Sequence, residues 1–414
     1  MTDLRAHAAC PPNAPPSLTD APLRHRFSSR SRRRAVPRWH VALILAATAR
    51  VAAAPLGAQS VLSYGDDATT IPSGTIRLGL LNTWSRWYQE YHAAPGVLIQ
   101  TRSQARITPL SIDLGITDRL MFTASVPSVG STESALYFSD PEHGDVADSM
   151  RSFDRSGIGE TMATLKFVWL GQQSERDRIA EHGLHVRSAL TASAVIGTGA
   201  PQRPTQQFGV ATGEGESGIQ GGSFWDFILG HTFWTSVGLR FEHHLRDTRA
   251  LRVGAGAPGD PFDATARPIQ VTRRLGDAYS IDVTPRLSLG EYLSVGARYQ
   301  YEHEQAGTFA GTLDVVDSAG NVTHLDAAAL GPASEFTNQW VGIGVVYSSV
   351  AASENGRGNY PFEITLQYRR FVSLSNNRPQ RGEWAAGLRF YQRLWGRGLV
   401  NRNVADSTQR RREP

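Results

Sequence analysis

The chain has a single cysteine, Cys10, among its 414 residues, and it has no long hydrophobic run. The longest uncharged apolar stretch covers residues 41–49, far fewer than the roughly 20 residues that a membrane-spanning helix needs. The mean hydropathy of −0.30 likewise argues against a bundle of spanning helices. Two classes remain: a β-rich soluble protein, or a membrane protein whose apolar residues are spread out by alternation.

The excess of positive charge is confined to the N-terminus. Residues 1–58 contain nine arginines against two aspartates, whereas the remainder of the chain is slightly acidic. Cys10 lies in the same region. The basic composition therefore does not indicate a nucleic-acid-binding protein, and a mature chain that starts at residue 59 has no thiol for a disulfide, a metal or a nucleophile.

Residues 1–58 have the order of an export signal. Arg32, Arg33, Arg34 and Arg38 form a positively charged region, residues 41–49 form an apolar core, and small residues precede Gln59. We therefore expect a leader over residues 1–58, with a true initiator downstream of residues 1–30 as an alternative start. After the leader we expect a periplasmic segment over residues 59–72, a barrel over 73–395 and a disordered polar tail over 396–414.

From residue 73 onward the dominant hydrophobic period is two, which is typical of strands with one apolar and one polar face. Residues 110–116 and 120–126, separated by a turn at Asp118, are the clearest example. We predict twelve strands of about nine to thirteen residues, within a range of about 10–14 strands. They are expected over residues 76–87, 110–116, 120–126, 157–169, 184–196, 223–231, 235–244, 281–289, 293–301, 339–347, 362–371 and 384–395.

Short and long connections alternate along these strands. Turns near Asp118 and Gly290 are tight, whereas the connections over 128–156, 197–222, 245–278 and 303–337 are long. Outer-membrane β-barrels have short periplasmic turns, long extracellular loops and an even number of strands. The fold class is therefore predicted as all-β, a single antiparallel transmembrane barrel rather than a soluble sandwich.

Tryptophans outside the leader lie at or near predicted strand ends, where the indole ring of a barrel meets the lipid headgroups. We predict two aromatic girdles formed by Trp84, Trp87, Trp169, Trp225, Trp234, Trp340, Trp384 and Trp395.

Charged residues fall on the polar face of ten or more predicted strands. A charge on the lipid face is costly, about 2–4 kcal/mol for an arginine at the midplane, so these side chains are expected to face the lumen. The alternatives are a hydrated channel lining and a network of ion pairs that fills the barrel. The candidate lining residues are Arg77, Asp113, Glu160, Lys166, Arg187, Asp226, Arg240, Glu242, Asp282, Arg286, Arg298, Glu302, Glu363, Arg369 and Arg389.

No motif in the sequence supports catalysis, a cofactor or a metal. The glycine-rich stretch 213–218 is followed by no helix, and its glutamates would repel a pyrophosphate. His243 and His244 are adjacent and therefore face opposite sides of a strand, so they cannot bind one metal together. His303 likewise faces the side opposite to its flanking glutamates. We expect no enzyme activity and no cofactor.

Four short motifs resemble a known family. Residues 115–120 (GITDRL), 156–160 (SGIGE), 196–199 (IGTG) and 224–226 (FWD) are similar to segments of bacterial outer-membrane β-barrel transporters. This group includes barrels associated with the meta-pathway of phenol degradation. The resemblance spans residues 70–395 and implies an outer-membrane barrel. The alternating final strand 384–395 also resembles the C-terminal signal that the barrel-assembly machinery of Gram-negative bacteria binds.

These observations predict a channel in the bacterial outer membrane for passive or facilitated passage of small solutes through a polar, mixed-charge lumen. Its partners would be outer-membrane lipid, the barrel-assembly machinery and small solutes, with no nucleic acid. The alternatives are a structural or adhesive barrel that acts through its external loops, and an outer-membrane lipid-modifying enzyme.

The leader assignment leads to a testable prediction. Cleavage is expected between Ala58 and Gln59, because Leu56, Gly57 and Ala58 place small residues at the cleavage site. Mass spectrometry of the protein purified from membranes should find Gln59 at the mature N-terminus. An N-terminus far from residue 59 would contradict this assignment.

Overall fold

The computed structural model describes residues 67–94, 97–138, 149–171, 183–205, 211–230, 232–256, 263, 265–290, 292–316, 320–354, 360–374 and 381–395. The leader with its cleavage site and the C-terminal tail lie outside these ranges, so those assignments stay predictions. In the described part of the chain, no helix combines the length and the apolar character needed to cross a membrane.

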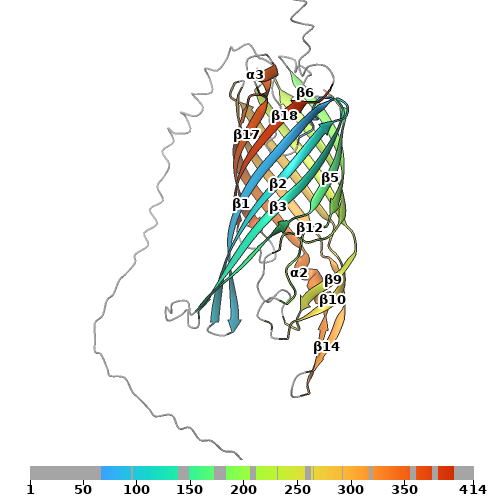
Figure 1. Cartoon of the computed structure of the whole chain (residues 1–414), viewed down its shortest axis with the longest axis vertical. Helices are drawn as coiled ribbons and strands as arrows, with labels where there is room; N and C mark the ends of the chain where they lie inside the picture. The colour runs from blue at the N-terminus through green and yellow to red at the C-terminus, as the bar shows by residue number, and fades with distance from the viewer. Residues whose placement is uncertain are drawn as a thin grey trace, which may run out of the picture. The chain divides into compact units, whose positions relative to one another are not determined.

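Twelve antiparallel strands close into a barrel (Figure 1). Going around the barrel, the order is β1, β2, β3, β5, β6, β7, β8, β11, β12, β16, β17 and β18, and β18 pairs with β1 to close the ring. The strands are β1 (Thr75–Ala94), β2 (Val97–Gly115), β3 (Leu120–Phe138), β5 (Thr161–Leu170), β6 (Leu184–Ile196), β7 (Gly218–Leu229), β8 (Phe233–His244), β11 (Ala278–Ser288), β12 (Leu293–Glu304), β16 (Phe336–Ser348), β17 (Phe362–Leu374) and β18 (Arg381–Arg393). The predicted twelve-stranded antiparallel barrel is therefore confirmed.

The two faces of the barrel wall differ as the alternation predicts. On β11, Asp282, Thr284 and Arg286 are buried, whereas Ile281 is exposed. On β16, Ile343 is 67% exposed. Apolar residues thus form the outer surface and polar residues face the interior, the reverse of a soluble protein.

Strands β1, β2 and β3 are longer than predicted. They have 20, 19 and 19 residues, and Figure 1 shows them continuing past the end of the barrel. Past Trp87 and Ser103, where β18 no longer pairs with β1, strands β1 and β2 lack regular alternation, because neither face of a strand beyond the membrane meets lipid, so backbone pairing extends them. Strand β4 (Ser149–Ile158) pairs with the extended part of β3.

Other long connections also contain secondary structure that the sequence did not reveal. Strands β9 (Asp247–Val253), β10 (Arg267–Arg274) and β13 (Thr308–Ala310) form a small sheet. A hairpin of β14 (Thr312–Val316) and β15 (Val322–Asp326) follows, with the short helices η3 (Ala327–Ala329) and α2 (Leu330–Ser334). Val253, Ile269, Val271, Leu325 and Ala327 form a hydrophobic core there, so this region, called the cap below, packs as a unit.

At the opposite end, the described connections include the tight β2–β3 turn and the short helix α3 (Val350–Glu354). Gly74 starts β1 at this end with φ 75, and its carbonyl accepts a hydrogen bond from Leu394 N at 2.7 Å. A Cβ atom on Gly74 would lie 2.1 Å from the carbonyl oxygen of Trp395. Only glycine therefore allows the chain to enter β1 beside the end of β18.

We predict that Gly74→Ala destabilises the barrel closure more than Gly290→Ala does. Both glycines have positive φ, which costs an alanine about 1–2 kcal/mol, but an added Cβ at Gly290 meets nothing within 4 Å. The temperature at which the compact barrel is lost on denaturing gels measures this difference. Equal temperatures for the two variants would show that the contact with Trp395 is not restrictive.

Candidate functional site: the barrel interior and its N-terminal segment

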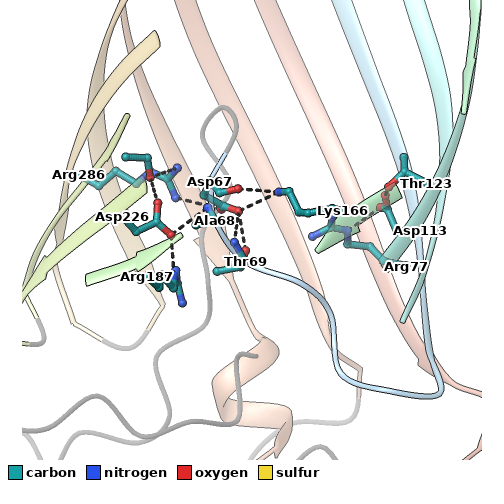
Figure 2. Close-up of polar contacts among 11 residues, drawn as sticks. Asp67, Ala68, Thr69, Arg77, Asp113, Thr123, Lys166, Arg187, Asp226 and Arg286 are labelled. Atoms are coloured by element: carbon teal, nitrogen blue, oxygen red, sulfur yellow. Dashed lines mark hydrogen bonds and ion pairs between the residues drawn. The ribbon is translucent and has the colours of Figure 1, made fainter. Parts of the chain in front are cut away.

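The chain enters the barrel interior before it forms the first strand. Residues 67–72, called the inserted segment below, are all buried, and Figure 2 shows them among side chains of the barrel wall. Thr70 Oγ1 donates to the carbonyl of Asp118 at 2.7 Å, in the β2–β3 turn, so the segment lies at the short-turn end. The sequence predicts that residues 59–72 precede the barrel as a periplasmic segment. The described part lies inside the barrel instead.

Asp67 is the anchor of the inserted segment. Lys166 on β5 donates to the Asp67 carbonyl at 2.6 Å, and its ammonium lies 3.7 Å from the carboxylate. Arg286 on β11 approaches the other carboxylate oxygen to 3.7 Å. Within the segment, the backbone N–H and the hydroxyl of Thr69 both donate to Asp67 Oδ1. Basic groups from opposite sides of the segment therefore meet one carboxylate.

Asp226 on β7 holds the next residue. Its Oδ2 accepts hydrogen bonds from Ala68 N at 3.0 Å and from Arg187 Nε at 2.6 Å, and its Oδ1 accepts one from Ser236 at 2.7 Å (Figure 2). The guanidinium groups of Arg187 and Arg286 lie 4.3 and 5.0 Å from the Trp234 ring. The ring is thus in cation–π contact with both arginines.

The inserted segment also has an apolar end. Ile71 packs against Met121, Tyr391 and Val350, the first residue of α3. Ser73 N then donates to Asp118 Oδ1 at 2.9 Å, which leads the chain into β1. The segment is consequently fixed at both ends, by ions toward the interior and by apolar contacts at the mouth.

A second group of ion pairs lies on β1, β2, β17 and β18. Arg77 Nε is 2.7 Å from Asp113, whose other oxygen accepts a hydrogen bond from Thr123. Glu363 accepts a hydrogen bond from the Tyr391 hydroxyl at 2.7 Å, and Arg389 lies 3.7 Å from it. This group neutralises the interior face on the side of the barrel where the ring closes.

Further from the short-turn end, charged side chains surround open space. Arg298 Nε donates to Asp282 at 2.7 Å, and Arg369 Nε donates to Glu383 at 2.6 Å. A cavity of about 480 Å³ lies beyond, with Gln220, Arg240, Glu242, Arg298, Gln300 and Glu302 among its lining residues. Side chains of both signs line this space.

The predicted lining residues fall into three groups. Eleven belong to the ion-pair networks just described, namely Arg77, Asp113, Lys166, Arg187, Asp226, Asp282, Arg286, Arg298, Glu363, Arg369 and Arg389. Arg240, Glu242 and Glu302 line the cavity. Glu160 differs, because it precedes β5 and its carboxylate accepts the N–H of Gly215 at 2.9 Å, where it fixes a connection between strands.

Sequence reasoning missed two acidic residues of the interior. Glu383 has the same parity on β18 as Arg389 and was omitted because the strand was started one residue too late. Asp67 carries no signal of this kind, because it lies outside any strand. Only the folded chain brings it to Lys166 and Arg286.

The girdle assignment needs a correction for two tryptophans. Trp84, Trp169, Trp384 and Trp395 are exposed by 43–54%, and Trp225 packs edge-on against Trp169 at 5.7 Å between ring centroids. Trp234 and Trp340 were assigned wrongly, because both are buried in the interior beside arginines, Arg369 lying 4.3 Å from the Trp340 ring. Trp87 belongs to β1, and its side chain lies outside the described part.

Comparisons with known proteins bear on the fold. No family model and no curated protein matches the chain. Among solved structures, the chain is similar to the COG4313 outer membrane channel from Pseudomonas putida F1, with 12% identity, a TM-score of 0.49, and coverage of 80% of this chain and 100% of that one. It is also similar to the Pseudomonas putida toluene transporter TodX, with 10% identity, a TM-score of 0.40, and coverage of 82% and 96%. A third similar structure is the translocator domain of the autotransporter NalP from Neisseria meningitidis, with 10% identity, a TM-score of 0.37, and coverage of 80% of this chain and 90% of that one.

These matches are bacterial barrels with very low identity to the chain, so the likeness concerns the fold alone. The barrel itself follows from the closed ring of strands, and the resemblance to outer-membrane β-barrel transporters stays a prediction. The association with phenol degradation stays a prediction.

A buried acid contacts the cap from the connection before β7, outside the membrane-spanning strands. Glu216, 3% exposed, accepts a hydrogen bond from Leu275 N at 3.2 Å and lies 3.7 Å from Arg273. Burial raises the pKa of the Glu216 carboxyl from 4.5 to about 7, because desolvation outweighs the hydrogen bond and the nearby arginine. Glu216 therefore keeps its proton to a higher pH in the folded protein than in the unfolded chain.

This shift predicts how the cap responds to pH. A raised pKa contributes stability that is complete below about pH 4.5 and is lost as the pH rises through about 7. The melting temperature of the wild type should therefore be lower at pH 8 than at pH 5. Glu216→Gln mimics the protonated acid, so its advantage over the wild type should grow between these pH values. If the melting temperatures of Glu216→Gln and the wild type differ by the same amount at both pH values, the raised pKa of Glu216 is refuted.

Proposed function

We propose that this protein is an outer-membrane channel for small solutes, and that the inserted segment is a removable plug in its lumen. The observation that carries the proposal is how residues 67–72 occupy the interior. Their inner end is held by Lys166, Asp226 and Arg286 through ion pairs and hydrogen bonds, whereas Ile71 makes apolar contacts at the mouth.

Polar contacts of this kind suit a plug that leaves. A buried ion pair is on average no more stabilising than well-packed apolar residues, because both ions lose their hydration. When the segment withdraws, however, Asp67 and the basic groups of the wall are hydrated again, whereas an apolar plug would expose hydrophobic surface to water. The Oδ2 atom of Asp67 and the Nη2 atom of Arg187 lack a hydrogen-bond partner within the described part, so the closed state is not fully satisfied.

The rest of the interior is compatible with passage of polar solutes. Arg240, Glu242, Arg298 and Glu302 place both signs of charge around the cavity beyond the plug. Opposite charges on neighbouring strands create a transverse field that orients polar solutes and gives weak ion selectivity. The lipid-facing surface and the closed ring of strands support a location in the outer membrane.

The proposal predicts that repelling the inserted segment opens the channel. Asp67→Lys replaces the carboxylate beside Lys166, Arg187 and Arg286 with a like charge. In planar bilayers, the variant should spend at least about tenfold more time in conducting states than the wild type, because a loss of about 1.4 kcal/mol in plug binding corresponds to tenfold.

Asp314→Lys is the matched control. It makes the same charge change at an exposed position of the cap, where Asp314 pairs with His324 at 2.7 Å, and it should conduct like the wild type. Denaturing gels of unheated samples show whether each variant forms a compact barrel. A compact Asp67→Lys barrel with unchanged conductance would reject the plug, and an absence of conductance in every form would reject the channel.

A further inference from the structure

Cross-strand pairing places one row of aromatic side chains on the outer face of the barrel. Tyr368 pairs with Trp384, Trp384 with Trp84, Trp84 with Arg106, and Arg106 with Gly130, across β17, β18, β1, β2 and β3. Directly paired residues point to the same side of a sheet. Trp84 and Trp384 are 43% and 54% exposed, so this side is the outer surface.

The next row toward the cap end is basic. Two residues further along each strand, the same register gives Arg370, Gly382, Arg86, Gln104 and Thr132. Arg86, Arg106 and Arg370 are exposed, and neither row contains an acidic residue.

On the other side of the aromatic row, the outer surface becomes apolar after one mixed row. Asn82 lies two residues back along β1, and Leu80 follows, paired with Leu110 and Leu388. The outer surface therefore changes from aliphatic to aromatic to cationic toward the cap end, the order in which a barrel meets hydrocarbon, the lipid interface and the headgroups.

The two rows border a groove of about 740 Å³. Its lining includes Trp84, Arg86, Arg106, Tyr368 and Trp384. Two glycines line it as well, Gly382 between Arg370 and Arg86 and Gly130 beside Arg106, and the absence of side chains there leaves the groove open. An added Cβ at Gly130 would meet nothing within 4 Å, and one at Gly382 would approach the Tyr368 hydroxyl to 3.2 Å.

The arginines are suited to phosphate. A guanidinium offers five N–H donors in a planar fork that matches a phosphate group, and Arg106 uses one of them, Nε, on Asn82 Oδ1 at 3.2 Å. This bond fixes the orientation of the guanidinium beside Trp84. Neighbouring strands are about 4.8 Å apart, so Arg370 on β17 and Arg86 on β1 are about 10 Å apart in the sheet. That spacing fits a headgroup with two phosphates better than a single phosphodiester.

We propose that this groove binds the phosphorylated glycolipid headgroup of the outer leaflet, the lipid A part of lipopolysaccharide. Arg86, Arg106 and Arg370 bind its phosphates, and Trp84 and Trp384 lie against its sugar and upper acyl chains. The assignment rests on the proposed membrane location with the cap outside, because only the outer leaflet carries this lipid. It does not depend on the plug.

The test uses the mature protein in detergent and native mass spectrometry to measure lipid binding. Bisphosphorylated lipid A should bind to the wild type at least about tenfold more tightly than fully dephosphorylated lipid A or phosphatidylglycerol, because the groove recognises paired phosphates. The double variant Arg86→Gln/Arg106→Gln should lose about tenfold in affinity, and Arg370→Gln alone should lose less.

The matched control is Arg246→Gln/Arg267→Gln, which removes two exposed positive charges away from these rows and should bind like the wild type. All five arginines lie outside the interior networks, so a compact barrel is expected for each variant. Equal binding of dephosphorylated lipid A or phosphatidylglycerol, or an equal loss in the control, would overturn the proposal. Conductance of Asp67→Lys measured in parallel separates this outcome from failure of the channel function.

Discussion

Closure of the sheet is the constraint on which the rest of this structure depends. Hydrocarbon offers no hydrogen-bond partner to an open strand edge, so β1 and β18 must pair along their length. Once the ring is closed, every strand has one face toward lipid and one toward the interior. Charges at alternate positions are then forced inside, where they must find partners. Arg77 with Asp113, Arg187 with Asp226, and Arg369 with Glu383 do so as directly paired residues of neighbouring strands.

The wall does not balance its own charges everywhere. Near the short-turn end, Arg187 pairs with Asp226 of the wall, whereas Lys166 and Arg286 both approach Asp67. Asp67 supplies the additional negative charge, and it is carried on a segment that is not part of the wall. An excess of buried positive charge would destabilise the closed barrel by several kcal/mol, so the Asp67 carboxylate both balances the wall and helps to hold the segment in place.

Inner and outer surfaces place the same residue types in opposite environments. Trp234 and Trp340 lie inside against arginines, where cation–π contacts stabilise buried guanidinium groups, whereas Trp84 and Trp384 face outward at the interface. Arg187 and Arg286 are likewise buried and paired with acids, whereas Arg86 and Arg106 face outward beside the aromatic row. Position along the strand and parity, not residue type, decide which role each side chain has.

The sequence by itself determined the barrel, its twelve strands and most of its inward charges, because alternation of period two and the parity of loop lengths are local properties. It could not reveal the pairs of cap strands such as β9 and β10, or the continuation of β1 and β2, where neither face meets lipid and alternation is absent. It misplaced Trp234 and Trp340, because a strand-end position does not state which way a side chain points. Only the tertiary structure brought Asp67 to Lys166 and Arg286, and only the register across four strands placed Arg370, Arg86 and Arg106 on neighbouring rows. Such contacts join residues that are far apart in the chain, and a local pattern contains no information about which distant strand becomes a neighbour.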